Sequence, residues 1–435
     1  MLRLDVYLEG IADPVGVLSR AEDGATSFRY LTADLPHPIS QSLPVQQEDF
    51  ADVATRGFFE NLLFENALRD QVMQRHGIDQ NDFVGLLNFL GKDCPGAISV
   101  VPEGSAPAKQ PGDLAKDYER LSTRDLESIM RSLRDRRRMP EDTADPSPLA
   151  GVQGKVALTR LPNGDFALPR AGSGAPTTHI LKVPRANDMR LVDHEHILMG
   201  IAAELLDHPV AETEILGDGD LRGLLVARYD RKVRDGRVMR IHQEDFCQAL
   251  GLGPYLKYQR NGTGDRMFSA RNVGRLLSIC DAPGRARMAF LEGTAVNLLL
   301  GNTDNHAKNH SLLYAGGRPE RPQLAPFYDI VPTLIDDQVT HQLSFDIGSA
   351  RMTDDIAFED LASFAADLGL RGFTAPMRHR LADLVTAVVG QIGGMSGPAR
   401  KRLGDAMAAQ AGCFARALQL EIDVPERDLV VVNRP

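Results

Sequence analysis

Residues 301–309 hold side chains whose types and spacing could transfer a phosphoryl group. Asn309 follows Asp304 by five residues, and Asp329 comes twenty residues later. Phosphoryl transfer needs a carboxylate that orients the attacking hydroxyl, together with oxygen ligands that hold magnesium on the phosphates. The spacing of Asp304 and Asn309 is that of the catalytic loop of protein kinases, where a later aspartate is the usual second metal ligand. These three residues therefore supply the set that the reaction requires.

A polar turn between a helix and a hairpin is the alternative interpretation of this stretch, because aspartate and asparagine are also common turn residues. Residues 302–309, however, include six Asn, Asp, His and Lys residues and directly follow the apolar helical segment expected over 295–300. Such a helix-to-hairpin context is what the motif needs. We therefore favour a site over a surface turn.

Lys182 is the second candidate, because it stands among aliphatic residues on a strand expected over 178–183. A buried, unpaired ammonium group is strongly disfavoured, so an anion or a carboxylate is expected beside it. A nucleotide phosphate is such an anion. Glu195, on a helix expected over 192–206, could supply the carboxylate. The alternative is a lysine that reaches water from an edge strand.

Two further segments complete the order of elements found in a kinase. One is a turn whose two glycines would let backbone N–H groups approach phosphates. This turn consists of Ala150, Gly151, Val152, Gln153, Gly154 and Lys155. The other is the end of the last expected strand, Ala227-Arg228-Tyr229-Asp230, where a linker could offer its backbone and an aromatic face to adenine. Each segment is a weak signal alone: a turn with two glycines is weak evidence for a phosphate site, and Tyr229 could equally be an ordinary core residue.

The first half of the chain is expected to be rich in strands. Loose alternation and turn residues predict short antiparallel strands within residues 3–30. The Asn163-Gly164 pair predicts the turn of a hairpin. Another strand pair is expected between residues 213 and 229, after which strands nearly disappear.

Helical spacing of apolar residues marks much of the remaining chain. Ser122 follows a breaker-rich linker and can cap a helix that runs to Arg138. The other helical segments are residues 58–76, 81–90, 243–301 and 357–422, with one hairpin-like stretch at 310–328. Strands first and helices afterwards predict an α+β architecture with a β-rich lobe and a helical lobe.

Length and charge limit the function further. A chain of 435 residues exceeds the size at which a single core stops growing, so two or more lobes are expected. The formal charge of −10 opposes unaided binding to phosphate backbones. The best basic cluster, residues 131–138, is followed at once by acidic residues, which is typical of a solvated helix end. Any DNA contact is therefore expected to be local or indirect.

Cysteine usage and the N-terminus indicate a cytoplasmic protein. The four cysteines show no spacing typical of a zinc site and are expected to be reduced and buried. Asp5 stands where a signal peptide needs its apolar run, and no apolar stretch is long enough to span a bilayer. We therefore expect no association with membranes.

Taken together, these motifs resemble the HipA family, bacterial kinases that form the toxin half of toxin–antitoxin pairs. The resemblance covers nearly the whole chain, and the combined set is specific although each piece is not. Its segments are residues 42–44, 58–63, 150–155, 178–184, 192–195, 228–231, 303–309 and 326–330. It implies a two-lobed, protein-kinase-like fold. An accessory β-rich subdomain would occupy residues 1–110, the kinase N-lobe 111–230 and the helical C-lobe 231–435.

Position by position, the resemblance implies that Asp304 is the catalytic base and that Asn309 and Asp329 hold Mg²⁺. Lys182 would bind the phosphates of ATP, and residues 150–155 would form the phosphate loop. The other nucleotide contacts would come from Ala227, Arg228, Tyr229, His306, Lys308 and Tyr328.

Partners are implied in the same way. Members of the family are restrained by a small helix-turn-helix antitoxin called HipB, which supplies most of the DNA contact. The acidic charge of this chain agrees with indirect DNA binding. Family analogy implies a protein substrate, namely a translation factor such as an aminoacyl-tRNA synthetase.

This sequence departs from its relatives at two positions. Relatives commonly carry an autophosphorylated serine where Pro148 stands here, and Ser147 lies one residue earlier. We favour modification at Ser147, because residues 142–148 are polar and proline-rich and should present it. The alternative is that the one-residue shift abolishes self-modification and that the protein depends on its antitoxin for restraint. Ala227 stands where some relatives place a glutamate, so we expect side-chain recognition of adenine to be reduced and backbone recognition to remain.

Two other classes of function compete with a toxic serine/threonine protein kinase. A small-molecule kinase would use Asp304, Asn309 and Asp329 in the same way but would enclose its acceptor in a pocket. A catalytically idle co-repressor subunit would act only together with an antitoxin. That role would not require Lys182, Asp304, Asn309 and Asp329. The presence of all four residues therefore counts against it.

Overall fold

The structure, a computed structural model, describes residues 1–65, 67–139, 154–398 and 400–435. Ser147, Pro148 and residues 150–153 of the expected phosphate loop lie outside the described residues. The chain forms two compact units. Unit 1 consists of Met1–Met189, Thr213–Pro254 and Ser311–Pro322, and unit 2 of Arg190–Glu212, Tyr255–His310 and Gln323–Pro435. The boundaries that we expect at residues 110 and 230 remain predictions.

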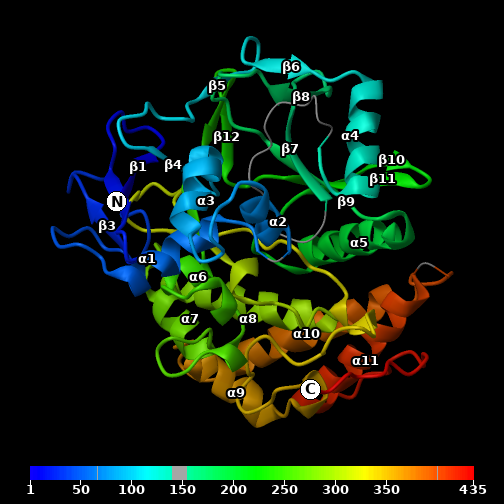
Figure 1. Ribbon diagram of the computed structural model, residues 1–435. Helices are drawn as coiled ribbons and strands as arrows, with labels where there is room; N and C mark the ends of the chain where they lie inside the picture. Colours follow the sequence, from blue (N-terminus) through cyan, green and yellow to red (C-terminus); the bar gives the residue numbers. More distant parts are fainter. Residues whose placement is uncertain (66, 140–153, 399) are drawn as a thin grey trace. The chain divides into compact units, whose positions relative to one another are not determined.

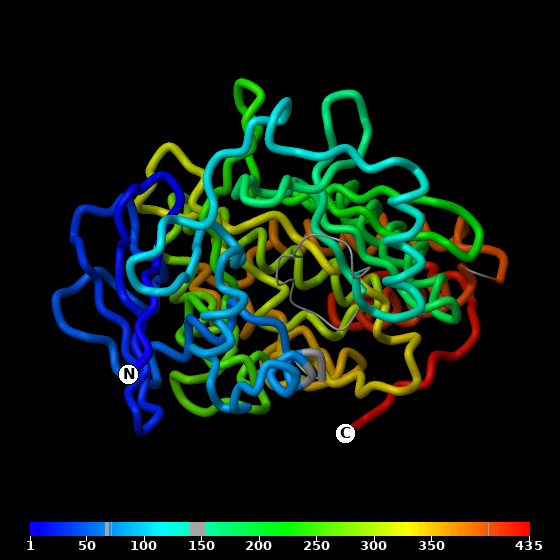
Figure 2. Tube along the Cα trace, turned by 45° about the horizontal axis from the view of Figure 1, so that its top comes forward, coloured from blue at the N-terminus to red at the C-terminus, as the bar shows by residue number. Residues whose placement is uncertain are grey.

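Unit 1 begins with an antiparallel sheet of four strands in the order β3-β2-β1-β4. The strands are β1 (Leu2–Leu8), β2 (Gly16–Arg20), β3 (Thr26–Tyr30) and β4 (Ile98–Pro102). The prediction of antiparallel strands within residues 3–30 is confirmed, and Figure 2 shows these first strands (blue) side by side.

Three helices follow these strands, namely α1 (Asp52–Phe59), α2 (Ala67–Arg75) and α3 (Phe83–Leu90). The prediction of one continuous helix over residues 58–76 is wrong, because the chain leaves helical conformation between α1 and α2. Phe28, Phe58 and Phe59 are fully buried in the core that the sheet and helices share. Apolar burial of this kind stabilises the subdomain by roughly 1.5–3 kcal/mol for each large side chain.

A second sheet of unit 1 has six strands in the order β10-β11-β9-β7-β8-β6. The strands are β6 (Tyr118–Arg120), β7 (Gly154–Arg160), β8 (Phe166–Pro169), β9 (His179–Val183), β10 (Thr213–Asp218) and β11 (Leu221–Ala227). Helix α4 (Thr123–Arg136) packs on β7, β9 and β11 (Figure 1). Ser122 caps this helix as predicted, in a capping box with Asp125. The predicted hairpin around Asn163-Gly164 is β7–β8.

The prediction that strands nearly disappear after residue 229 is wrong. A further hairpin joins β12 (Arg231–Arg234) to β13 (Arg237–Arg240), and β13 pairs with β5 (Gly112–Asp113). Asp235 and Gly236 form its turn with φ values of 51° and 74°. Two consecutive left-handed residues are typical of the tight turn that Asp-Gly favours between strands. Beyond it, β14 (Gln243–Asp245) leads into α6 (Phe246–Ala249) and pairs with β15 (Ser311–Leu313).

Unit 2 is mainly helical. Its helices are α5 (Arg190–Leu205), α7 (Ala270–Leu276), α8 (Pro283–Leu299), α9 (Phe358–Asp367), α10 (Ala375–Ile392) and α11 (Lys401–Leu418). It also contains the short strand β16 (Gln323–Leu324). Helix α8 packs on α10 and α11 (Figure 1) and is buried along most of its length. Within residues 243–301 the expected helical structure is confirmed only in part, because much of 254–269 is irregular.

Single turns of 3-10 helix occur in both units. They are Glu60–Leu62, Gly91–Asp93, Ala186–Asp188, Pro254–Leu256, Gln259–Asn261, Leu277–Ile279, Ala307–Asn309, Thr333–Ile335 and Thr353–Asp355. The four cysteines are buried, as expected. Over the ranges that the structure describes, no helix is long and apolar enough to cross a membrane.

Candidate active site

The predicted catalytic loop lies in unit 2, directly after α8. Gly301 leaves the helix with φ 81°, a left-handed conformation that glycine adopts without steric cost. Asn302 then bonds back to the helix: its N–H donates to the carbonyl of Asn297 (2.8 Å), and its Nδ2 donates to Asn297 Oδ1 (2.7 Å). Both asparagines are nearly inaccessible to solvent. The loop therefore starts from buried hydrogen bonds, which a solvated surface turn would not need.

Hydrogen bonds bring Asp304 and Asn309 together. The carbonyl oxygen of Asp304 accepts from the N–H of His306 (2.9 Å) and from Nδ2 of Asn309 (3.1 Å). The N–H of Asp304 donates to Asn302 Oδ1 (3.1 Å). Its carboxylate accepts a hydrogen bond at Oδ1 from the hydroxyl of Tyr258 (2.9 Å). The expected catalytic base and one of the two expected metal ligands are thus fixed on one loop.

Asp329 lies close to this loop in the fold. Its φ of 61° is left-handed, which is uncommon for a residue other than glycine. Residues held in such conformations are concentrated at functional sites. The hydroxyl of Tyr328 donates to the carbonyl of Lys308 (2.9 Å), and Nδ2 of Asn302 lies 3.5 Å from the carbonyl oxygen of Asp329. The segment that carries Asp329 is therefore tied to the catalytic loop within unit 2.

Lys182 lies in unit 1 on β9, and only 9% of it is exposed. This strand pairs with β11 on one side and β7 on the other, so the edge-strand alternative is wrong. Lys155 on β7 stands directly opposite Lys182. Like charges at opposing positions destabilise a sheet, so two ammonium groups here favour an anion beside them. Glu195, the expected carboxylate, is a buried residue of α5 in unit 2.

Gly154 opens β7 and is the one glycine of the expected phosphate loop that the structure describes. A Cβ atom there would lie 2.9 Å from the carbonyl oxygen of Leu133 and 3.2 Å from that of Val183. Arg137 donates from Nη1 to the same Val183 oxygen (3.0 Å). Close packing beneath the end of α4 therefore requires glycine at this position. Contact with phosphate is a separate property and remains a prediction.

The expected hinge follows β11. Ala227 is the last residue of this strand, and the N–H of Arg228 donates to the carbonyl of Thr178 (3.0 Å). The hydroxyl of Tyr229 donates to the side-chain oxygen of Gln243, so the ring has a defined position.

Arg228 is committed to a buried ion pair. Its Nε and Nη2 donate to the two oxygens of Asp230 (3.0 and 2.9 Å), and its side chain is 7% exposed. Arg231 also pairs with Asp230 (2.7 Å). Burial alone would raise the pKa of Asp230, but the two guanidinium groups lower that pKa to about 2. The Arg228 side chain therefore serves the fold of unit 1.

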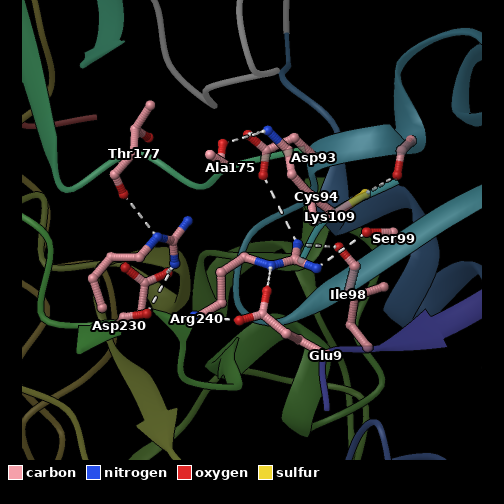
Figure 3. Close-up of polar contacts among 12 residues, drawn as sticks. Glu9, Asp93, Cys94, Ile98, Ser99, Lys109, Ala175, Thr177, Asp230 and Arg240 are labelled. Carbon is pink, nitrogen blue, oxygen red and sulfur yellow. Dashed lines mark hydrogen bonds and ion pairs between the residues drawn. The ribbon is translucent and has the colours of Figure 1, made fainter. Parts of the chain in front are cut away.

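Arg240 forms a second buried ion pair, with Glu9 (Figure 3). Glu9 accepts at Oε2 from Nε and at Oε1 from the backbone N–H of Arg240, both at 2.7 Å. The other guanidinium nitrogens donate to the carbonyl of Ile98 (2.8 Å) and to Ser99 Oγ (3.1 Å). Since the Arg240 side chain is 1% exposed, this pair is a fixed part of the interior.

Asp93 joins the same cluster through Lys109, whose Nζ lies 3.1 Å from Asp93 Oδ2 (Figure 3). Arg240 Nη1 lies 3.8 Å from the other carboxylate oxygen. Burial acts to raise the pKa of Asp93, yet Lys109 and Arg240 hold that pKa far below its ordinary value. Sequence patterns did not predict this cluster, because its members come from four distant parts of the chain.

A buried carboxylic acid, Glu244, connects the N-terminal segment to β14. It accepts hydrogen bonds from the hydroxyls of Ser40 (2.5 Å) and Tyr314 (2.7 Å) and from the N–H of Gln41 (3.1 Å). Burial raises the pKa of Glu244 to about 7, although these three donors favour the ionised form. The group is fully buried, so its protonation is coupled to folding.

Sequence reasoning also missed Tyr258, the residue that touches the Asp304 carboxylate. It lies 46 residues before Asp304, within residues 254–269, where most of the expected helix is replaced by irregular structure. No signal in the sequence could have paired the two residues.

Comparisons with known proteins agree with this fold. The HipA-like C-terminal domain family matches residues 147–392, and the HipA N-terminal domain family matches residues 4–101. The Y4mE protein of Sinorhizobium fredii is 33% identical over 400 residues, which are 88% of this chain and 89% of that protein. The serine/threonine-protein kinase toxin HipA of Shewanella oneidensis is 32% identical over 85% of this chain and 84% of its own length.

A solved structure extends the agreement to three dimensions. The complex of HipA, HipB and operator DNA from Shewanella oneidensis MR-1 matches with a TM-score of 0.75 and 27% identity, over 96% of this chain and 97% of that chain. The predicted α+β, kinase-like fold is thus confirmed. The chain belongs to the HipA family of serine/threonine-protein kinase toxins.

Proposed function

We propose that this protein transfers the γ-phosphoryl group of ATP, with Mg²⁺, to a serine or threonine hydroxyl, and that Asp304 is its catalytic base. One observation carries the proposal: Asp304 and Asn309 are joined on a buried loop to which the segment carrying Asp329 is hydrogen-bonded. Kinases arrange a base and two metal ligands on two segments in this way.

The residues present fit magnesium. Nδ2 of Asn309 is used by the carbonyl of Asp304, which leaves the amide oxygen as the atom to bind a cation. Asp329 adds a carboxylate. Mg²⁺ is commonly held by one or two protein oxygens together with substrate phosphates and water. The described ranges contain no cluster of three or more His, Cys, Asp or Glu that could hold a metal ion.

Nucleotide binding is proposed first for residues of unit 1. Lys182 and Lys155 would face the phosphates, since their positions on neighbouring strands place two positive charges together. At the hinge, the backbone after Ala227 and the ring of Tyr229 would receive adenine, because the side chain of Arg228 is engaged with Asp230. His306, Lys308 and Tyr328 are proposed as further contacts, along with residues 150–153.

In such a reaction the protein forms no covalent bond to the substrates and acts mainly by positioning them and stabilising charge. Bound Mg²⁺ would neutralise charge on the phosphates. Asp304 orients the acceptor hydroxyl and takes its proton as the oxygen forms its bond to the γ-phosphorus, while the bond from that phosphorus to ADP breaks. Lys182 stabilises the negative charge on the phosphate oxygens.

Family membership supports the biological role. The Shewanella oneidensis protein was solved with HipB and operator DNA, so we propose a HipB-like helix-turn-helix antitoxin as the partner of this chain. DNA contact would be indirect, in line with the net charge of −10. The protein would act in the cytoplasm on a translation factor such as an aminoacyl-tRNA synthetase. A small-molecule kinase and an idle co-repressor remain the competing proposals.

Labelled ATP and cell lysate test the proposal. The wild-type protein should label one lysate protein, whereas Asp304→Asn should lower the rate by roughly 100-fold or more, the usual contribution of a general base. Asp329→Ala should be inactive in the same assay, because a metal ligand is lost. Label confined to small molecules would favour the first competitor, and no label with intact antitoxin binding would favour the second.

A further inference from the structure

Tyr258 lies against the catalytic loop of unit 2. Its hydroxyl donates to Asp304 Oδ1 at 2.9 Å. Its ring meets His306 edge-on, with centroids 5.3 Å apart, and the guanidinium group of Arg260 stands 4.0 Å from its centre. The N–H of Ala307 donates to the carbonyl of residue 257 (3.1 Å), so the two backbones are also joined. Tyr258 therefore has neighbours on its ring and its hydroxyl, and the residue before it is hydrogen-bonded to the catalytic loop.

The next residue, Gln259, anchors the segment on its other side. Its N–H donates to the carbonyl of Ser344 (2.8 Å). Its side-chain amide exchanges two hydrogen bonds with Asp346: Nε2 donates to Oδ2 (2.8 Å), and Oε1 accepts from the N–H (3.0 Å). Three hydrogen bonds on one glutamine leave the preceding tyrosine little freedom to move. Groups locked by such supporting bonds hold an active site to the required precision.

We propose that Tyr258 is a positioning residue that fixes the carboxylate of Asp304 for phosphoryl transfer, an inference that rests on the proposed function of Asp304. The backbone of Asp304 is held by Asn302, His306 and Asn309, but these bonds leave the side-chain torsions free. The hydroxyl of Tyr258 restrains Oδ1, and Oδ2 is then directed to the acceptor hydroxyl. A phenol donates this bond without adding a charge beside the base.

The size of the effect follows from geometry. A base that can rotate spends less time within hydrogen-bond reach of the hydroxyl, and a displacement of about 1 Å can cost roughly 100-fold in rate. Loss of one restraint on a carboxylate whose backbone stays fixed should cost less, roughly 10-fold in kcat. The KM for ATP should change by less than about 2-fold, because Tyr258 acts on the acceptor side of the reaction.

The test compares Tyr258→Phe with wild type in MgATP kinetics, with myelin basic protein as the acceptor. This change removes the hydroxyl and keeps the ring under Arg260. Tyr255→Phe is the matched control, because Tyr255 belongs to the same segment and is 66% exposed. We expect only Tyr258→Phe to lower kcat, with thermal unfolding unchanged in both variants.

A double variant separates positioning from a structural role. In an Asp304→Asn background, Tyr258→Phe should cause no further loss, since groups that act as a unit are not additive. Wild-type kcat in Tyr258→Phe, or an additive loss in the double variant, would overturn the inference while the role of Asp304 stands. Full activity of Asp304→Asn, or a wild-type protein that transfers phosphate neither to myelin basic protein nor to any protein of the cell lysate, would refute the proposed function and the positioning role with it.

Discussion

The buried pair of Arg240 and Glu9 gives a quantitative prediction about the stability of unit 1. Arg240→Met removes the guanidinium group and keeps an aliphatic chain of similar reach. Glu9 is then left 5% exposed, with the backbone N–H of residue 240 as its remaining hydrogen-bond donor from this pair. The carbonyl of Ile98 and the hydroxyl of Ser99 also lose a donor.

The expected loss of stability comes from the Glu9 carboxylate, which stays buried without its charged partner. Removal of one partner of a buried ion pair typically costs about 3–5 kcal/mol, because the other charge stays in the interior without compensation. Unit 1 contains about 240 residues. For a unit of this size each kcal/mol lowers the unfolding temperature by roughly 2–4 °C. We therefore expect the first thermal transition to fall by roughly 6–20 °C.

Calorimetry of four variants, namely Arg240→Met, Glu9→Gln, their double variant and Arg234→Met, checks this reasoning. Arg234→Met is the matched control, because Arg234 lies in the same hairpin, is 70% exposed and pairs with an exposed aspartate. Its unfolding temperature should stay within about 2 °C of wild type, as surface pairs contribute little. In Glu9→Gln/Arg240→Met no charge is stranded, so the loss should be smaller than the two single losses combined. Equal effects of Arg240→Met and Arg234→Met, or simple additivity in the double variant, would refute the argument.

Two further predictions concern other buried charges. Lys182→Ala should weaken ATP binding, measured by calorimetry, by roughly 10–100-fold, which is the range for a lost charge-assisted hydrogen bond. The control Lys232→Ala, at an exposed lysine, should leave the affinity for ATP unchanged. Equal ATP affinities of Lys182→Ala and wild type would show that Lys182 does not belong to the nucleotide site. Folding raises the pKa of Glu244 from 4.5 to about 7, so its contribution to stability is present below pH 4.5 and is lost as pH rises through 7. Relative to Glu244→Gln, wild type should therefore lose roughly 3 kcal/mol between about pH 5 and 8; parallel pH profiles of unfolding for the two proteins would contradict this.

Local signals in the sequence were enough to predict many elements of the fold. Ser122 followed by Asp125 marks a capping box, Asn163-Gly164 marks a hairpin, and both are found where their chemistry requires them. The Asp235-Gly236 turn carries the same kind of signal and was overlooked, so the strands after residue 229 were predictable in principle. The errors at residues 58–76 and 254–269 have another cause. There, tertiary packing interrupts apolar spacing that is compatible with a helix.

The residues of the candidate site also differ in how far the sequence could predict their contacts. Asp304 and Asn309 are close in sequence, and their spacing alone predicted a common loop. Tyr258 reaches Asp304 across 46 residues, and Glu9 reaches Arg240 across 231, so only the folded chain brings these partners together. Arg228 illustrates the opposite case. Its position in the motif is consistent with the family pattern, but the contacts of its side chain could be known only from the structure.

The N-terminal region provides partners for groups that the rest of unit 1 buries. Glu9 neutralises Arg240, Ser40 donates to Glu244, and Nδ2 of Asn61 donates to the carbonyl of residue 252 (2.8 Å). Each contact joins residues 4–101, which match the HipA N-terminal domain family, to the strands and turns that follow β11. A buried charge or polar group without its partner costs several kcal/mol, and marginal stability leaves little reserve for two or three such losses. The region is therefore an integral part of unit 1, and the segment from 240 to 252 depends on it for stability.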